Sequence, residues 1–349
     1  MQHHLLNPFR GQGLPSANDL PSTDANAVAE LLALCPAHAQ TPLVAVDGLA
    51  REAGVATLWA KDERGRMGLG SFKALGAAYA IAKDAAQSRG AGEWAQALAG
   101  QTYVTASAGN HGLSVAAGAR VFGAQAIIYL AETVPDAFAQ RLEAIGARTV
   151  RAGATYEDSM AAAEAVAQEQ GWRLLSDSSW PGYTGPPGRV MEGYLQMAAE
   201  AAAQIPEPPT HILLQAGVGG LAAAVASHAR ATWGDMPTII VVEPAFAPAL
   251  IESIRAGEIV DTSGPVSDMG RLDCKTPSMI ALAGLARDAD LFVTISEAEA
   301  VAGKSRLADH GLATTPSGAA GIAALLPGLP GVGRDARVLA FVSEGPEDG

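Results

Sequence analysis

The sequence predicts an α/β protein with two lobes, each built on a doubly wound parallel sheet. From residue 102 onward, apolar segments of strand length alternate with amphipathic segments of helix length, as in strand–helix–strand units. The 349 residues exceed what one ordinary hydrophobic core accommodates. Hydrophobic residues make up 49% of the chain but aromatic residues only 5%, which favours an α/β core over a β-sandwich. We therefore expect two lobes with the active site in the cleft between them.

The first run of alternating elements predicts a smaller, substrate-binding lobe over residues 75–185. Strands are expected at 103–105, 126–130, 149–150 and 173–176. Amphipathic helices are expected between them at 111–122, 135–146 and 155–170. Because parallel strands need crossover connections and helices supply them, these strands should form one parallel sheet with helices on both faces.

The second run predicts a larger, cofactor-binding lobe made of residues 1–74 and 186–349. Helices near 188–205, 220–232, 246–256, 297–309 and 317–326 alternate with strands at 211–215, 238–243, 291–295 and 337–342. A helical patch at 25–34 and a short strand at 56–61 are expected to complete this lobe. Residues 262–277 form the longest irregular stretch and are expected to line the cleft.

Composition argues against several classes of partner. The formal net charge of −13 leaves no basic stripe for a nucleic acid. No apolar run is long enough to span a membrane, and no signal peptide is evident after Met1. The two cysteines, Cys35 and Cys274, are typical of a reducing compartment, so we expect a cytoplasmic protein. His3 and His4 have no third ligand nearby and are expected to fray, so no metal site is predicted.

Lys73 is the candidate for a reactive amine. It follows the glycine-rich turn at 68–70 and begins an apolar helix in which Ser71 is a plausible N-cap. The positive end of the helix dipole and a buried helix face both favour the neutral form of an amine. A neutral amine is nucleophilic and can form a Schiff base.

The distribution of lysines supports this choice. The chain has only five, at positions 61, 73, 83, 275 and 304. Lys61 and Lys83 are each followed by acidic residues, and Lys304 lies in a mixed polar helix, which suits solvent. Lys73 has no carboxylate neighbour in the sequence, although an ordinary solvated lysine stays as the alternative.

A glycine-rich loop, Gly217-Val218-Gly219-Gly220-Leu221, follows an apolar strand and opens a helix. Glycines let backbone N–H groups approach a phosphate, which a helix N-terminus also favours. The spacing differs from the G-x-G-x-x-G of dinucleotide-binding folds. Glu243 nevertheless lies near the distance expected for a ribose-binding acid, so a nucleotide stays as an alternative.

Two further segments begin helices at strand or loop ends. The loop Ser107-Ala108-Gly109-Asn110-His111-Gly112 offers backbone N–H groups that suit a carboxylate, and the Asn110 amide can bond a phenolic oxygen. An ordinary turn at Gly109-Asn110 is the alternative. Ser317 heads a small-residue helix, where it serves either as an N-cap or as a ligand.

These segments resemble, in order and spacing, the parts of a fold-type II pyridoxal phosphate enzyme. Ser71-Phe72-Lys73 resembles the Schiff-base lysine segment of the tryptophan synthase β and threonine dehydratase superfamily. The loop 107–112 is similar to its substrate-carboxylate loop, Gly217–Leu221 to its phosphate loop, and Ser317 to its pyridine-nitrogen partner. The resemblance implies pyridoxal 5'-phosphate as the cofactor and a homodimer as the assembly.

Longer stretches resemble the diaminopropionate ammonia-lyase family within that superfamily. They are Lys61–Arg64 with Gly68-Leu69, Asp177–Tyr183, Val190–Tyr194, Leu272–Ser278 and Ser343–Gly345. The stretch from Trp180 to Tyr183 is the most specific, because threonine dehydratases lack it. The resemblance implies that Asp177 lies near the β-amino end of the substrate and that Tyr183 contributes to the same site. A turn or N-cap aspartate is the alternative for Asp177.

The implied reaction is α,β-elimination from a small β-substituted L-amino acid, most closely 2,3-diaminopropionate, which gives pyruvate and ammonia. Lys73 would remove the Cα proton, and Ser317, unlike an aspartate, would not keep the pyridine nitrogen protonated. At Ala108 the family pattern has an aspartate that acts on D-isomers, whereas serine and threonine dehydratases have a small residue. A serine-, threonine- or hydroxyaspartate-type dehydratase is therefore the nearest alternative. A non-catalytic ligand-binding α/β protein is the alternative from another class.

Overall fold

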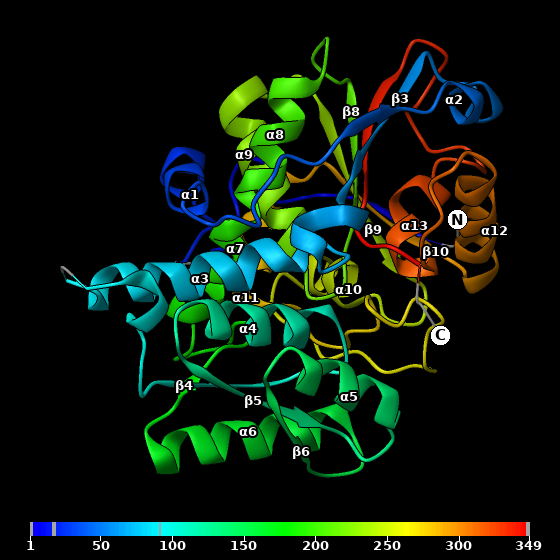
Figure 1. Cartoon of the computed structure of the whole chain (residues 1–349). Coiled ribbons are helices and arrows are strands. Elements are labelled where there is room, and N and C mark those ends of the chain that lie inside the picture. Colours follow the sequence, from blue (N-terminus) through cyan, green and yellow to red (C-terminus); the bar gives the residue numbers. More distant parts are fainter. Residues whose placement is uncertain (1–2, 16–18, 91, 347–349) are drawn as a thin grey trace.

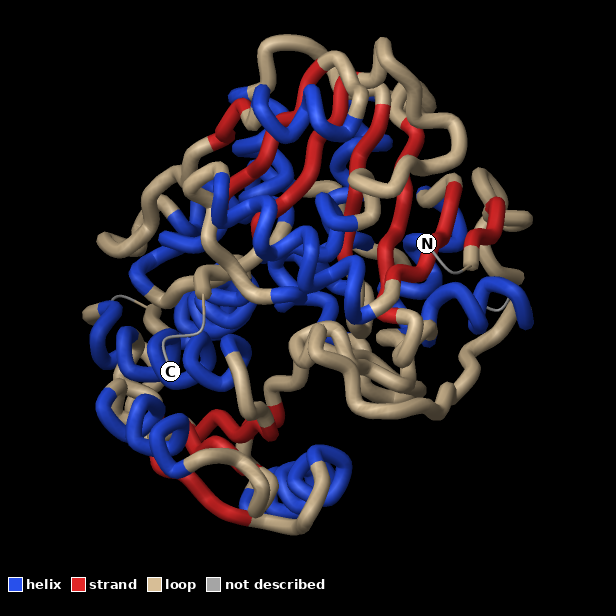
Figure 2. The backbone as a smooth tube through the Cα atoms, turned by 90° about the vertical axis from the view of Figure 1, so that its right-hand side faces the viewer, coloured by secondary structure: helices blue, strands red, loops and turns tan. Residues whose placement is uncertain are grey.

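Two separate sheets organise the chain. The computed structural model describes residues 3–15, 19–90 and 92–346. Seven strands form the larger sheet in the order β1-β10-β9-β8-β11-β3-β2, and four form the smaller in the order β6-β5-β4-β7. Figure 2 shows the strands of the larger sheet in the upper part of the molecule and those of the smaller sheet in the lower part. The predicted α/β architecture is confirmed.

The smaller sheet is entirely parallel. Its strands are β4 (Thr102–Ala106), β5 (Gln125–Leu130), β6 (Arg148–Arg151) and β7 (Arg173–Leu174). The crossover helices are α4 (Asn110–Val121), α5 (Asp136–Ala144) and α6 (Tyr156–Gln170). Each lies where the alternating pattern predicted it, and all four strands fall within residues 75–185.

The larger sheet is parallel except at its two edges. Its parallel strands are β3 (Thr57–Asp62), β8 (His211–Gln215), β9 (Thr238–Pro244), β10 (Leu291–Ile295) and β11 (Arg337–Val342). The edge strands β1 (His4–Leu6) and β2 (Leu43–Ala45) pair antiparallel to β10 and β3. The prediction that His4 belongs to a frayed terminus was wrong, because backbone pairing with β10 orders it.

Helices cover both faces of the larger sheet. They are α1 (Ala25–Leu32), α2 (Asp47–Ala53), α7 (Gly185–Gly193), α8 (Leu195–Gln204), α9 (Gly220–Trp233), α10 (Ala249–Ala256), α11 (Met279–Asp288), α12 (Glu297–Asp309) and α13 (Pro316–Ala323). Alternate residues of one strand point to opposite faces: Ile239 and Val241 face the core with α9 and α11, whereas Ile240 and Val242 face α12 and α13. Figure 1 shows α8 and α9 on one side of the strands and α12 and α13 on the other.

Three features of the helices differ from the prediction. The single helix expected at 188–205 is divided into α7 and α8, which meet at Tyr194. Helix α2 was not predicted because it is short, and α11 was not predicted because apolar residues surround it, so it lacks an amphipathic period. Residues 262–277 contain neither helix nor strand, as predicted.

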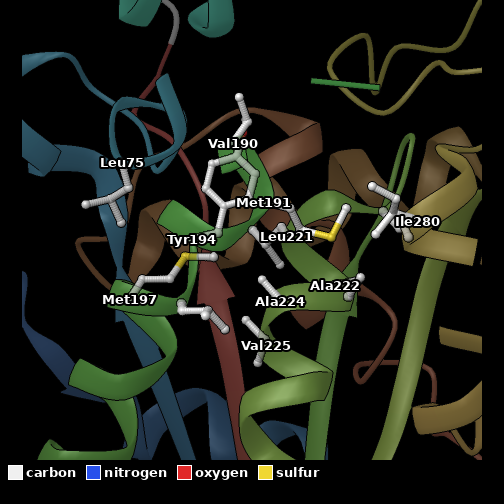
Figure 3. Packing of buried hydrophobic residues seen from close by; sticks show 14 of the residues in the cluster. Leu75, Val190, Met191, Tyr194, Met197, Leu221, Ala222, Ala224, Val225 and Ile280 are labelled. Carbon is white, nitrogen blue, oxygen red and sulfur yellow. The ribbon is translucent and has the colours of Figure 1, made fainter. Parts of the chain in front are cut away.

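Helix α3 (Lys73–Ser88) runs between the two sheets and carries Lys73 as its first residue. It packs against α4 of the smaller unit and α7 of the larger one. Figure 3 shows the core beside it, where Leu75 of α3, Met191 of α7 and Leu221 of α9 lie around Tyr194.

A buried charge cluster, consisting of Lys61, Glu63, Arg66 and Glu200, lies beneath the segment that leads into α3. Lys61 Nζ lies 2.8 Å from Glu200 Oε2, and Arg66 contacts Glu63 and Glu200 at 2.7 Å. Each side chain is at most 4% exposed. The prediction that Lys61 suits solvent was therefore wrong, because its carboxylate partner comes from distant α8 and not from its sequence neighbours.

The described parts of the chain contain no helix that is both long enough and apolar enough to cross a bilayer. Cys35 and Cys274 are both free thiols. No group of three or more His, Cys, Asp or Glu side chains within residues 3–15, 19–90 and 92–346 is placed to hold a metal ion.

Candidate active site

Lys73 and Asp177 form an ion pair. Lys73 projects from the first turn of α3, and Asp177 follows β7. The pair therefore connects residues that precede and follow the four strands of the smaller sheet in the sequence. Burial lowers the pKa of Lys73, but Asp177 outweighs burial and the net shift is upward. Burial likewise raises the pKa of Asp177, but Lys73 and His111 outweigh it and hold that pKa below its usual range. The prediction that the helix dipole and burial keep Lys73 neutral was therefore wrong, because Asp177, which is distant in the sequence, favours the charged amine.

The start of α3 also differs from the prediction. Phe72 occupies the N-cap position, and no side chain caps the helix there. The predicted cap, Ser71, instead pairs through its backbone with Glu344, and its Oγ is buried without a hydrogen-bond partner among the described residues. A buried polar atom without a hydrogen-bond partner either lowers the stability of the fold or marks a place where a ligand binds.

Two aromatic rings flank the Lys73 amine. Its Nζ lies 5.3 Å from the ring centroid of Phe72 and 5.9 Å from that of Tyr194. The two rings contact each other, with centroids 4.8 Å apart. Aromatic faces attract a cation and exclude water, so they fix the amine in a poorly hydrated place.

The Tyr194 ring contacts both the glycine-rich loop 217–221 and the surroundings of this amine. Gly219 has a φ of +100°, which a glycine tolerates best, and it precedes Gly220 at the first position of α9. A Cβ added at Gly220 would lie 3.4 Å from Tyr194 Cε2, and one at Gly217 would lie 2.9 Å from Cys274 Sγ. The glycines thus let the loop pack closely against Tyr194 and Cys274 at a helix N-terminus, which is the kind of position where a phosphate binds. Val218 and Leu221 are the other two members of this predicted loop.

Glu243, the acid considered for a nucleotide ribose, has another role. Its two carboxylate oxygens accept hydrogen bonds from the backbone N–H groups of Leu250 and Ile251 at 2.7 and 2.8 Å. Burial raises its pKa to about 8. Because the whole carboxylate serves the start of α10, it is not placed to bind a ribose, and the nucleotide alternative loses its support.

The loop 107–112 is shaped by its own serine. Ser107 Oγ accepts hydrogen bonds from the backbone N–H groups of Gly109 at 3.2 Å and Gly112 at 3.0 Å. Asn110 begins α4, and its amide donates to Glu344 Oε2 at 2.5 Å. Asn110 thus faces the loop after β11, which brings the smaller and larger units together beside Lys73.

His111 is a neutral acceptor beside the ion pair. Its Nε2 lies 2.8 Å from the Leu175 carbonyl, which can only accept, so Nε2 carries the proton. Its Nδ1 is buried without a hydrogen-bond partner in the described structure. Burial lowers the pKa of His111, with Asp177 opposing and Lys73 reinforcing the shift.

Ser317 is not the N-cap of its helix. Thr315 caps α13, because its side chain accepts from the Gly318 N–H, and Ser317 lies inside the first turn. The Oγ of Ser317 accepts from the backbone N–H of Arg271 at 3.1 Å, and the residue is 2% exposed. Since that bond uses a lone pair, the hydroxyl proton is available to an acceptor in the site.

Tyr183 supports the chain that carries Asp177. Its hydroxyl donates to the Leu174 carbonyl at 2.8 Å and accepts from the Ser176 N–H at 3.1 Å. Its ring stacks on Trp180 with centroids 4.3 Å apart. These contacts hold the segment that leads to Asp177. The substrate contact predicted for Tyr183 stays a prediction. Tyr183 also lines a cavity of about 430 Å³ that does not include Lys73.

Comparison with known proteins identifies the family. Residues 34–344 match the model of the pyridoxal-phosphate dependent enzyme family. The chain belongs to this family. It is also 33% identical over 341 residues to the diaminopropionate ammonia-lyase of Escherichia coli strain K12, an alignment that covers 88% of this chain and 85% of that protein. This match places the chain in the diaminopropionate ammonia-lyase family.

Other relatives agree. A mouse serine dehydratase-like protein is 28% identical over 308 residues, which is 87% of this chain and 86% of that protein. The crystal structure of Escherichia coli diaminopropionate ammonia-lyase in complex with an aminoacrylate-PLP azomethine reaction intermediate superposes with a TM-score of 0.88 at 29% identity. That superposition covers 98% of this chain and 93% of the other. The predicted fold-type II architecture is confirmed.

The residues of this pyridoxal-phosphate dependent enzyme fit the cofactor on physical grounds. Ser71 Oγ, His111 Nδ1 and the Tyr194 hydroxyl are buried in the described structure without hydrogen-bond partners, and all three belong to residues around Lys73. The glycine-rich loop ends at the N-terminus of α9, and its glycines at 217 and 219 pack so closely that an added Cβ would lie 2.9 Å from Cys274 Sγ and 3.0 Å from Ala281 Cβ. A small ligand with an anionic end and a carbonyl that reacts with an amine satisfies both features.

Sequence reasoning missed two members of the site. Glu344 lay within a stretch assigned by resemblance but received no role, although it accepts from Asn110 and Thr315. Tyr194 also received no role. The sequence signal for Tyr194 is the glycine that precedes it inside a predicted helix. Gly193 packs closely against α3, where an added Cβ would lie 2.6 Å from the Leu75 carbonyl oxygen.

Proposed function

We propose that this enzyme is a lyase that eliminates the β-substituent of a small β-substituted L-amino acid, most closely 2,3-diaminopropionate, to give pyruvate and ammonia. The observation that carries this proposal is the Lys73–Asp177 pair, which sets an amine beside a carboxylate that can hold a second ammonium. The family membership and the likeness to diaminopropionate ammonia-lyase support it.

The residues that would hold pyridoxal 5'-phosphate lie at the N-terminal ends of three helices, α3, α4 and α9. Lys73 would form the covalent link, with Phe72 beside it, and Gly217–Leu221 would bind the phosphate at the N-terminus of α9. The Asn110 amide would turn from Glu344 toward the phenolic oxygen. When bound, the cofactor supplies an electron sink for the charge that develops at the substrate Cα.

Ser317 sets the electronic character of the site. Its Oγ already accepts from the Arg271 N–H, so it can donate its proton to an unprotonated ring nitrogen but cannot supply a positive charge. A neutral ring nitrogen is a weaker electron sink than a protonated one. Prompt loss of a β-leaving group is therefore favoured over reactions that need a long-lived carbanion.

Asp177 would bind the β-ammonium group of the substrate, and Lys73 would remove its Cα proton. The loop 107–112 would bind the α-carboxylate through backbone N–H groups other than those of Ser107, Gly109 and Gly112, which already donate to Tyr129 or Ser107. Asp177 stays ionised at neutral pH because its pKa is held low, so it attracts the cationic β-amino group of diaminopropionate. With that ammonium as the partner of Asp177, a Lys73 amine released from its covalent link would lack the interaction that otherwise keeps it protonated. The amine can then accept the Cα proton as the general base.

A dehydratase is the second candidate, and Ala108 is the observation that favours it. This position carries no carboxylate, and the Arg271 guanidinium donates to its carbonyl at 3.2 Å. A site without a second acid here lacks an obvious base for the opposite face of the substrate. The proposal is accordingly restricted to L-substrates.

We further propose a division into a cofactor-binding domain of residues 1–74 with 186–349 and a substrate-binding domain of residues 75–185. The separation of the strands between the two sheets supports it. A cytoplasmic homodimer is part of the same proposal, and the two free thiols are consistent with a reducing compartment. Light scattering on the purified enzyme would test the assembly.

The decisive experiment is a substrate panel with both enantiomers. We expect keto-acid release from L-2,3-diaminopropionate, slower release from L-serine, L-threonine and L-3-hydroxyaspartate, and none from the D-isomers. Comparable rates on the hydroxyamino acids would favour the dehydratase. A colourless protein that ignores added pyridoxal 5'-phosphate and is silent on the whole panel would support a non-catalytic binder and overturn the proposal.

A further inference from the structure

A cavity of about 430 Å³ lies where α3 and α7 pack together (Figure 1). Its walls come from the second half of α3, from β4 and β7, and from the start of α7. Asp84 on its wall is about 16 Å along α3 from Lys73. Neither Lys73 nor Asp177 lines the cavity, so it is separate from the candidate active site. Its volume falls in the range of roughly 300–1,000 Å³ that is typical of pockets for small molecules.

The polar side of this cavity carries two guanidinium groups and one carboxylate. Asp84 Oδ2 lies 2.8 Å from Arg173 Nη1, and Asp84 Oδ1 accepts a hydrogen bond from Arg189 Nη1 at 2.5 Å. The Tyr103 hydroxyl donates to the same carboxylate at 2.8 Å. Two positive charges and one negative charge leave a net charge of +1 on the cavity wall. This sign is opposite to that of the whole chain, whose net charge is −13.

The two guanidinium groups keep donors for a ligand. Each guanidinium has five N–H donors. Within the described structure, the Arg189 side chain donates only to Asp84, and Arg173 pairs with Asp84 and with Gln101 Oε1 at 3.2 Å. Both arginine side chains are 37% exposed, against 13% for Asp84. The accessible part of the cluster therefore consists mainly of N–H donors.

The rest of the wall is largely apolar. Ala80 of α3, Leu174 and Leu175 of the β7 segment, and Pro186 of α7 contribute aliphatic groups. The Tyr183 hydroxyl is already bonded to the Leu174 carbonyl and the Ser176 N–H, so Tyr183 offers its ring. A molecule that fills the cavity therefore needs an apolar body beside its charged end.

We propose that this cavity binds a small monocarboxylate with an apolar body, at a site distinct from the substrate site. Guanidinium groups match the geometry of a carboxylate and donate to both of its oxygens. One negative charge neutralises the net charge of +1 on the wall. A phosphate dianion would exceed it, and the second negative charge would be repelled by Asp84. Binding here does not involve the reaction at Lys73, so the site can be tested without turnover.

Calorimetric titration of the cofactor-loaded enzyme with benzoate tests the site. Benzoate carries one carboxylate on an apolar ring, and benzamide is its uncharged analogue of the same shape. We expect benzoate to bind at least about tenfold more tightly than benzamide, the size of a charge-assisted hydrogen bond. Inorganic phosphate should bind more weakly than benzoate. Tighter binding of phosphate would overturn the assignment to monocarboxylates, and an absence of benzoate binding would overturn the site.

Substitutions on the wall locate the bound carboxylate. Arg189→Gln removes one guanidinium, so benzoate affinity should fall about tenfold or more. Because that substitution also breaks the ion pair with Asp84, exposed Gln87 on the same wall supplies a second test. Gln87→Glu should lower the affinity and Gln87→Lys should raise it, each by about two- to fivefold. Gln140→Glu is the matched control, because it makes the same charge change at an exposed position of α5 away from the cavity.

Amide hydrogen exchange distinguishes this cavity from the substrate site. Benzoate in the cavity should slow exchange in the peptides over 84–87 and 173–176 and leave the loop 107–112 unchanged. Slower exchange at 107–112, with an affinity that responds to neither Arg189→Gln nor the Gln87 variants, would place the carboxylate at the substrate loop and overturn the proposal. An enzyme that is silent on every substrate but binds benzoate as expected would lose the proposed function and keep this site.

Discussion

Lys73 and Asp177 are 104 residues apart in the chain, yet they are ion-paired between the start of α3 and the end of β7. Each shifts the pKa of the other toward the charged form, against the effect of burial. The free amine of Lys73 is therefore held as an ammonium ion. Under the proposed function, a substrate whose cation pairs with Asp177 would leave Lys73, once its covalent link has opened, without the carboxylate that keeps it protonated, which links the choice of substrate to the start of the reaction.

Asp177→Asn tests this link. The amide keeps the shape but cannot attract an ammonium ion, so kcat/KM for diaminopropionate should fall about 100-fold, the size of a charge-assisted hydrogen bond. The value for L-serine should fall less than tenfold, because serine carries no β-cation. Asp136→Asn is the matched control, since its carboxylate is 92% exposed at the surface and should leave both values unchanged. Equal losses on both substrates would contradict the assigned role of Asp177.

Lys73→Ala tests the covalent link. Without the amine the protein should incorporate no borohydride-stable cofactor, and turnover should fall at least ~1000-fold because base and nucleophile are both lost. Mass spectrometry of the reduced protein measures the first effect. Lys304→Ala removes an exposed lysine and should behave as the wild type. Cofactor trapped in Lys73→Ala at another lysine would show that the amine had been assigned wrongly.

Most of the fold was predictable because local patterns determine it. Strand β8 and helix α12 begin and end where their apolar periods and flanking residues predict. Helix α11 is buried on every side, so no period marks it. The pairing of β1 with β10 joins the first residues to the last third of the chain and has no local signal.

The site was predictable as a set of segments but not as a set of contacts. Lys73, the loop 107–112, the loop 217–221 and Ser317 were found because glycines, small residues and helix starts mark them. The partner of Lys73 was not found, because Asp177 reaches it only after the smaller sheet has formed. The burial of Lys61 was missed for the same reason, since Glu200 comes from α8.

Glu200→Gln tests the buried charge cluster. The substitution leaves Lys61 and Arg66 with one buried anion, so the free energy of unfolding should fall by about 3–5 kcal/mol. Burial raises the pKa of Glu200, but Arg66 and Lys61 outweigh it and lower that pKa to about 2. The stabilisation is thus present above the unfolded-state pKa of about 4.5 and is lost as the pH falls toward 2. Urea unfolding at pH 7 measures the effect, with exposed Glu169→Gln as the control. A change below 1 kcal/mol would mean that the cluster contributes little.

His111→Gln tests the neutral histidine. The folded-state pKa of His111 lies below its unfolded value of about 6.5, so the unfolded chain binds this proton first as the pH falls. Below that pH the folded state should lose up to about 1.4 kcal/mol of stability per pH unit from this group. The variant should show a shallower slope between pH 6.5 and 5 in denaturant unfolding. His38, His211 and His228 have lowered pKa values too, so only the difference from the wild type is informative. Identical slopes in the variant and the wild type would show that His111 does not have a lowered pKa in the folded state.

Gly217→Ala tests the glycine-rich loop at the start of α9. The added Cβ would lie 2.9 Å from Cys274 Sγ and 3.0 Å from Leu272 Cα, so the loop must move and its N–H groups lose their alignment. The dissociation constant for pyridoxal 5'-phosphate, measured by absorbance titration, should rise at least about tenfold, with a small change in unfolding midpoint. Gly270→Ala, in the same neighbouring segment but with open space around its Cβ, should bind as the wild type does. Adding Cys274→Ala to Gly217→Ala removes the sulfur from the contact and should recover part of the affinity, because only the contacts with Leu272 and the Arg271 carbonyl then remain. Unchanged cofactor affinity in Gly217→Ala would show that the phosphate binds elsewhere.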